Sequence, residues 1–177
     1  MFRILCFVGV GSVAVVAAAA LALAPTAGAT HLESGMSISV ADSAKLVNGV
    51  YLVVPVSVTC PAIELSPTQF IQFEDAFVSV SEKVGKVVTG GGGQVSYYSN
   101  GPSSGQAQGT PLTCDGAPHA YAINVFPESS GYFPIAPFKG GKAVAFGYFS
   151  ISIFDTSTFE GDSNNVQAGP ISISIKG

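Results

Sequence analysis

The sequence predicts an all-β fold, an immunoglobulin-like two-sheet sandwich of seven or eight strands, on three observations. Apolar and polar residues alternate in most segments after residue 35, which is typical of half-buried strands. Turn residues separate these segments every 8 to 15 residues or so, and uninterrupted helical periodicity is absent. Cys60 and Cys114 offer one disulfide, and sandwiches of this type often contain one. A closed β-barrel is the alternative fold.

The first two expected strands show the alternation most clearly. Met36, Ile38 and Val40 share one face, and the even-numbered residues of 50–60 share the core face of the next strand. Pro55 has no N–H to donate, so this second strand must lie at a sheet edge or be irregular there.

Later strands are expected over 74–81, from 84 to 88, over 121–125, over 144–153 and over 171–175. In 144–153 the apolar positions change phase between Tyr148 and Phe149, beside Gly147. Such a change predicts a bulge or a kinked strand.

The first 29 residues are predicted to be an export signal, with residues 30–177 as the mature domain. Arg3 precedes an uncharged apolar run from Ile4 to Ala24, and Ala27-Gly28-Ala29 has the small residues that signal peptidase reads. The run is long enough to cross a bilayer, so an uncleaved anchor is the competing interpretation. After cleavage the protein is expected to be secreted and to have no membrane span.

The charge and composition argue against nucleic acid as a partner. The whole chain has a formal net charge of -4, and only 10% of its residues are charged. The basic residues after position 29 are all lysines, and the chain has no tryptophan. Such a chain lacks the positive footprint that a phosphate backbone requires.

Cys60 and Cys114 are predicted to form a disulfide, because they are the two cysteines of the exported part and export leads to an oxidising compartment. Closing a loop of about 55 residues stabilises the fold by roughly 4 kcal/mol on the chain-entropy model. Zinc is not expected here. Structural zinc normally takes four N/S ligands, and the exported part has only these cysteines, His119 and the terminal His31 to offer.

Two segments carry a resemblance to known proteins. Residues 54–61 end a strand in a cysteine, and residues 114–127 open with Cys-Asp-Gly and continue into an aromatic strand and a Pro-containing turn. A Phe…Gly-Lys-Ala strand follows at 138–145. In these features the chain resembles small secreted bacterial immunoglobulin-like proteins of unknown function. Many relatives have a second, late cysteine pair where this chain has residues 155–165, and the resemblance implies no functional residues.

Residues 89–112 are expected to form a mobile stretch between strands. No Gly-Lys-Ser/Thr follows Gly90–Gly93, so a flexible hairpin loop is favoured over a phosphate-binding loop. Tyr97 and Tyr98 either stand exposed as ligand contacts or pack down as part of a strand. With Tyr132, they are the candidate ligand-binding residues.

The loop over 155–165 is a candidate calcium site. Asp155, Glu160 and Asp162 bring carboxylates close together in sequence, and calcium takes oxygen ligands. The spacing does not match an EF-hand, and a solvated acidic turn is the competing interpretation. No other cofactor is expected.

We expect a non-catalytic binding or surface-interaction module whose partner is an unknown extracellular ligand or envelope component. A structural cell-envelope component is the alternative. A carrier of a small apolar ligand, like the sandwich apoproteins that hold enediyne chromophores, is a further alternative, suggested by Phe126, Phe133, Phe138, Phe146 and Phe149.

A hydrolase is the least favoured class. A glycoside hydrolase would need Glu74 with Asp75 to converge with the 155–162 loop as paired carboxylates. His119, however, is the only histidine away from the expected mature terminus, and the chain has no Gly-x-Ser-x-Gly elbow. The sequence therefore predicts that the protein is not an enzyme.

Overall fold

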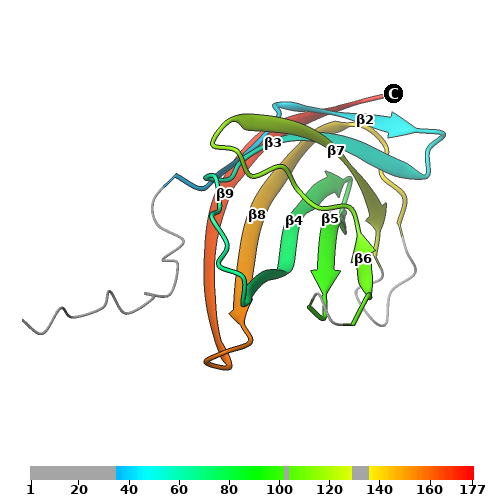
Figure 1. The fold of residues 1–177 in the computed structure, drawn as a ribbon. Helices are drawn as coiled ribbons and strands as arrows, with labels where there is room; N and C mark the ends of the chain where they lie inside the picture. The colour runs from blue at the N-terminus through cyan, green and yellow to red at the C-terminus, as the bar shows by residue number, and fades with distance from the viewer. Residues whose placement is uncertain (1–34, 102–103, 129–135) are drawn as a thin grey trace, which may run out of the picture.

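The computed structural model describes residues 35–101, 104–128 and 136–177, and this part of the chain is all-β (Figure 1). It contains no helix, and therefore none that is long and apolar enough to cross a membrane. The nine strands are β1 (Ser37–Val40), β2 (Ser43–Val47), β3 (Tyr51–Thr59), β4 (Gln69–Val84), β5 (Val87–Ser99), β6 (Ala107–Gly109), β7 (Pro118–Pro127), β8 (Gly141–Asp155) and β9 (Glu160–Lys176).

Seven of these strands pair in a closed ring, in the order β2-β3-β7-β5-β4-β8-β9 and back to β2. β1 adds to β3, and β6 adds to the edge of β5. Two short contacts close the ring. They are a parallel pairing of β2 with β9 and a crossing of β7 over β5 at Gly91 and Gly92. The pairing is thus that of the closed barrel, the alternative fold, because these two contacts join what would be separate sheets in a sandwich.

The core follows the alternation read from the sequence. On β3, Leu52, Val54, Val56 and Val58 are buried, as the even-numbered face predicts. Val50, which precedes this strand, is exposed in the turn instead. Residues 76, 78 and 80 of β4, 123 and 125 of β7, and 173 and 175 of β9 complete the same interior. The predicted disulfide between Cys60 and Cys114 is present beside this core.

Pro55 lies at a break in the sheet, as its missing N–H requires. One edge of β3 pairs with β7 throughout, while the other edge pairs with β1 over 56–59 and with β2 over 51–53. The Pro55 carbonyl accepts a hydrogen bond from the N–H of Ala41, in the gap between β1 and β2. The lost donor therefore falls where no ladder partner is needed.

The phase change predicted in β8 has a different cause from the one expected. The pairing of β8 with β9 does shift register between Ala145 and Gly147. The odd-numbered residues from 143 to 153 are nevertheless all buried. Val144 and Phe146 stand on the outer face, 38% and 47% exposed. The apparent change of phase arises because Val144 and Phe146 are apolar residues on the outer face of the barrel.

The expectation of a mobile loop over 89–112 is wrong for its first half, because Gly90–Gly93 lie inside β5 and pair with β4. A Cβ at Gly91 would overlap the carbonyl oxygen of Phe126, and one at Gly93 would overlap that of Asn124. The glycines let the backbone of β7 cross close to β5, which is a recognised reason for glycine within a strand.

Candidate functional site

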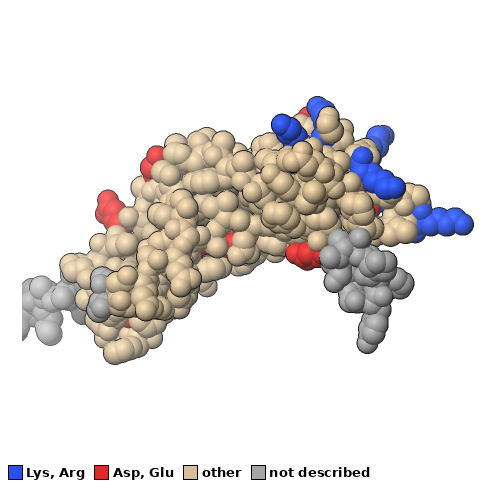
Figure 2. All heavy atoms as spheres, turned by 90° about the vertical axis from the view of Figure 1, so that its right-hand side faces the viewer, with Lys and Arg blue, Asp and Glu red and all other residues tan. Residues whose placement is uncertain are grey.

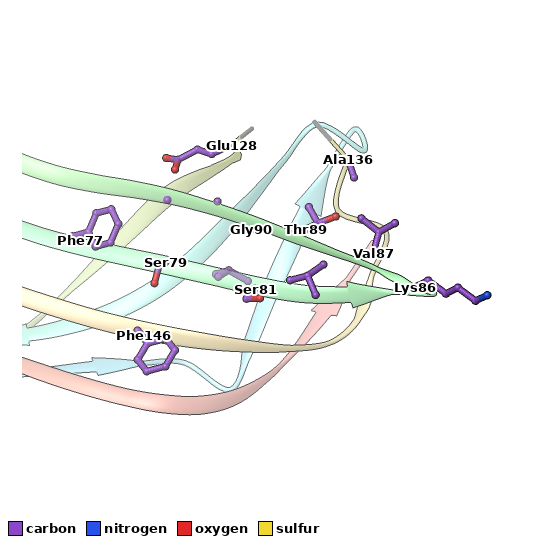
Figure 3. A pocket seen from close by; sticks show the side chains of 14 residues that line it. Phe77, Ser79, Ser81, Lys86, Val87, Thr89, Gly90, Glu128, Ala136 and Phe146 are labelled. Carbon is purple, nitrogen blue, oxygen red and sulfur yellow. The ribbon is translucent and has the colours of Figure 1, made fainter. Parts of the chain in front are cut away.

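A cleft of about 930 Å³ lies against β4, β5 and β8, near the β4–β5 turn (Figure 3). Its apolar lining comes from Phe77, Val80, Val87, Val88, Ala136 and Phe146. Its remaining lining residues are Ser79, Ser81, Lys86, Thr89, Gly90, Gly91, Gly92 and Glu128.

Strand register places small residues at the floor of this cleft. Ser79 of β4 pairs with Gly92 of β5 on one side and with Phe146 of β8 on the other, and Ser81 pairs with Gly90. Side chains directly opposite one another in neighbouring strands share a face of the sheet. Two serines and two glycines therefore lie together on the outer face, and their small size leaves a hollow beside the Phe146 ring.

Gly90 and Gly92 also allow Phe77 and Glu128 to form the walls of the cleft. A Cβ at Gly92 would come within 2.9 Å of the Phe77 ring and 3.2 Å of Glu128 Oε1. The N–H of Glu128 donates to the carbonyl of Gly90 at 2.9 Å, which holds the end of β7 against β5. Figure 3 shows Lys86 at the opposite end of the cleft from Glu128 and Phe77. The cleft thus has an acidic end and a basic end, with apolar residues between them.

Thr89 is a lining residue whose side chain points toward the interior of the barrel. The residue is 3% exposed, and its hydroxyl oxygen is buried without a hydrogen-bond partner among the described residues. Its neighbour across the β4–β5 pairing is Glu82, which is also buried and accepts a hydrogen bond from the N–H of Lys139 at 3.0 Å. Buried hydroxyls in native structures are nearly always paired, so Thr89 is an exception. Its pairing with Glu82 places its side chain on the inner face of the sheet, opposite the floor of the cleft.

Lysines gather at the cleft end of the molecule. Lys86 lies in the β4–β5 turn and Lys83 near the end of β4, while Lys142 pairs with Ser174, and Lys45 pairs with Lys176 in neighbouring strands. Figure 2 shows that the basic side chains of the visible face gather at one end, with a few acidic atoms beside them. The end of the cleft at the β4–β5 turn is therefore basic, within a chain of negative net charge.

Tyr97 and Tyr98, predicted as ligand contacts, lie within β5 rather than on a loop. Tyr97 is half-buried and pairs with Glu74 and Gly109. Tyr98 is 43% exposed, and its hydroxyl donates to the side chain of Asn100. Neither residue lines the cleft. Tyr132 and Phe133 lie outside the described residues.

The acidic residues predicted as calcium ligands lie on the β8–β9 hairpin. Asp155 and Glu160 pair across the turn, and Asp162 pairs with Ile153. The Asp155 carboxylate accepts hydrogen bonds from the N–H and the hydroxyl of Ser157, at 2.8 and 2.6 Å. These bonds hold the pKa of Asp155 below its usual range. Within the described ranges, no three His, Cys, Asp or Glu side chains gather as a metal-ligand set, so calcium binding stays a prediction.

Two acidic side chains named as hydrolase candidates face opposite sides of β4. Glu74 is fully buried and accepts a hydrogen bond from the N–H of Leu112 at 2.8 Å. Burial raises its pKa, and this hydrogen bond opposes the rise. Asp75 faces the other side of the strand, where burial also raises its pKa. His119 lies instead beside Asp115, with 2.8 Å between Nε2 and Oδ1, and this hydrogen bond lowers the pKa of Asp115. The structure does not bring Glu74 and Asp75 together as a catalytic pair.

Phe77 is the large residue of the cleft lining that sequence reasoning missed. Phe146 stood among the phenylalanines suggested for an apolar ligand, but as one of five. Of the others, Phe138 and Phe149 are in the core, and Phe126 packs against Tyr51 with 5.2 Å between ring centroids. The available signal in the sequence was the out-of-phase apolar pair Val144 and Phe146.

Comparison with known protein families, curated proteins and solved structures finds no match to this chain. The geometry of the cleft is therefore the basis for assigning a function.

Proposed function

We propose that the protein is a secreted, non-catalytic binding module whose cleft holds an apolar ligand group, aromatic in character and carrying a negative charge. The carrying observation is the cleft itself, an apolar hollow lined by Phe77 and Phe146 with Lys86 at one end. Ligand sites are typically clefts of roughly 300 to 1,000 Å³, mostly apolar and with a few placed polar groups. The cleft of about 930 Å³ fits this description.

The ligand character follows from the lining. Phe77 and Phe146 supply flat apolar surface, which suits an aromatic ring. The ammonium group of Lys86 favours an anionic substituent at its end of the cleft, whereas Glu128 disfavours one at the other end. The proposed ligand therefore lies with its charged group toward the β4–β5 turn.

Secretion and a relationship to small bacterial immunoglobulin-like proteins belong to the same proposal. The Cys60–Cys114 disulfide supports an oxidising compartment. It also joins the end of the β3 segment to the Cys-Asp-Gly turn, the two features on which the resemblance rests. The barrel closure distinguishes this chain from an open two-sheet member of that architecture.

The experiment is a fluorescence titration of the purified protein with two dyes of similar shape. 1-Anilinonaphthalene-8-sulfonate is aromatic and anionic, while N-phenyl-1-naphthylamine lacks the charge. We expect saturable binding of both, with the sulfonate tighter. Ser79→Phe, which fills the floor of the cleft, should abolish saturable binding. Ser163→Phe, on an exposed position of β9, is the matched control and should leave it unchanged.

Two results decide against the proposal. One is dye binding that survives Ser79→Phe in a protein whose circular dichroism is unchanged. The other is the absence of saturable binding by either dye. Loss of dye binding with Tyr98→Ala instead would favour the exposed tyrosine face of β5 as the site. No binding together with tight association with the cell envelope would favour the structural alternative.

A further inference from the structure

We infer that the partner of the cleft is the β8–β9 hairpin of a second copy of this chain, which inserts Phe159 and joins molecules head to tail. This inference rests on the proposed function, because it names the occupant of the same cleft. It explains both the cleft and the exposed Phe159 on the β8–β9 turn at the other end of the molecule.

Phe159 is the most exposed large apolar side chain in the described part of the protein, at 80%. It also has a positive φ of 59°, a conformation that is costly for a bulky side chain. A glycine or asparagine would suit this turn position better. Strained residues of this kind cluster at functional sites, where surrounding structure holds them.

The turn holds Phe159 in place through several hydrogen bonds. The N–H of Phe159 donates to the carbonyl of Asp155 at 2.9 Å. Ser157 donates twice to the Asp155 carboxylate, and both the N–H and the hydroxyl of Thr156 donate to the carbonyl of Thr68 at 2.9 Å. An exposed aromatic side chain on so well-ordered a turn is prepared to bind, since little freedom is lost on insertion.

The hairpin and the cleft lie at opposite ends of β4 and β8. Gln69 pairs with Asp155 at one end, and Glu82 pairs with Ala143 at the other. The β8–β9 turn therefore extends beyond the start of β4, while the cleft lies toward its end. A hairpin at one end and a receptor at the other cannot meet within one molecule, so the contact must be between molecules.

Charge complementarity supports this pairing. Asp155 and Glu160 flank the turn that carries Phe159, and Lys86 lines the cleft with Lys83 and Lys142 in the adjoining hollow. Approach of the acidic hairpin to the basic end is favoured at low ionic strength. Glu128, the acidic residue in the cleft lining, opposes it. The hairpin should therefore enter from the Lys86 side.

A contact between two different surfaces is heterologous, and such contacts produce open chains of molecules when the rotation does not close a ring. The expected behaviour is association that grows with protein concentration and weakens with salt. The cleft is larger than one phenyl ring, so it has room for neighbouring turn residues as well.

The test is sedimentation velocity of the purified protein over a series of concentrations at low and high salt. Wild type should form progressively larger species at low salt. Phe159→Gly removes the ring and suits the positive φ, so the variant should fold normally and remain monomeric. Ser79→Phe should also remain monomeric, because its cleft is filled. An equimolar mixture of the two variants should form dimers and nothing larger, since one supplies only a cleft and the other only a hairpin. Tyr98→Ala is the control for loss of an exposed aromatic, and Glu128→Gln should associate more strongly than wild type.

The inference is overturned if wild type stays monomeric at every concentration, or if Phe159→Gly associates as wild type does. In either case the proposed function would still hold if wild type binds the dye and Ser79→Phe does not. A mixture of Phe159→Gly and Ser79→Phe that remains monomeric would also overturn the inference of head-to-tail association. Failure of both association and dye binding would remove the inference and the proposed function together.

Discussion

At the level of single residues, the Thr89 hydroxyl is a buried polar atom with no hydrogen-bond partner among the described residues. A buried hydroxyl without a partner costs stability. Valine has nearly the same shape and lacks the oxygen. Threonine at this position should therefore make the protein less stable than valine would.

Thr89→Val should raise the free energy of unfolding of the ligand-free protein by about 1 kcal/mol. Urea denaturation measures this change. Thr110→Val, at an exposed position, is the control and should have little effect. A clear loss of stability in Thr89→Val would mean that the hydroxyl is hydrogen-bonded in solution, contrary to this account.

Glu74 makes stability depend on pH in a definite direction. Its pKa is raised above 4.5 by burial, although the N–H of Leu112 partly offsets this. A carboxyl group with a raised pKa favours the folded state when it is protonated, and this contribution is present below pH 4.5. The contribution is lost as the pH rises through the raised pKa, because the folded protein must then hold a buried negative charge.

Glu74→Gln should therefore change the pH dependence of the melting temperature. The difference, wild type minus variant, should be largest below pH 4.5 and should fall as the pH rises toward neutrality. Glu64→Gln, at an exposed carboxylate, controls for the loss of one negative charge. A difference that grows with pH would show that the ionised carboxylate is stabilised in its site, contrary to this account.

At the level of elements, the glycines of β5 perform two different tasks. Gly91 and Gly93 let β7 cross closely, whereas Gly90 and Gly92 lower the floor of the cleft. The two tasks alternate along the strand because successive residues face opposite sides of a sheet. A single run of glycine thus serves both barrel closure and the site.

Gly93→Ala should destabilise the protein by about 1 to 3 kcal/mol, because the new methyl group would overlap the backbone of β7 at Asn124. Gly90→Ala is the matched control. Its Cβ would meet nothing closer than 3.8 Å, so stability should stay equal or rise slightly. Chemical denaturation of the two variants distinguishes them, and equal destabilisation would show that the glycines share one role.

The strands were predictable where alternating side chains report a buried face, as on β3, β4 and β7. Glycines carry no side chain to report a face, so the sequence predicts a loop from residue 89 onward, where β5 continues as a strand. Ring closure depends on two short contacts, β2 with β9 and β7 with β5, which no local pattern encodes. The cleft depends on Phe146 meeting small residues of two other strands, and only the three-dimensional register reveals this.

At the level of the whole molecule, charge and apolar surface are unevenly distributed. Lys83, Lys86 and Lys142 line the cleft and the hollow beside it, while Asp155, Glu160 and the exposed Phe159 lie at the β8–β9 hairpin. A chain of net charge -4 is therefore expected to orient anionic ligands toward one end, with a strength that salt reduces.

The most direct test of the central claim is a map of the site by amide chemical shifts. Isotope-labelled protein is titrated with 1-anilinonaphthalene-8-sulfonate under conditions in which the protein is monomeric. The largest shift changes are expected at residues 79–81, 86–92 and 146, where β4, β5 and β8 line the cleft. Changes centred on Tyr97 and Tyr98, or on residues 155–162, would place binding elsewhere and contradict the account.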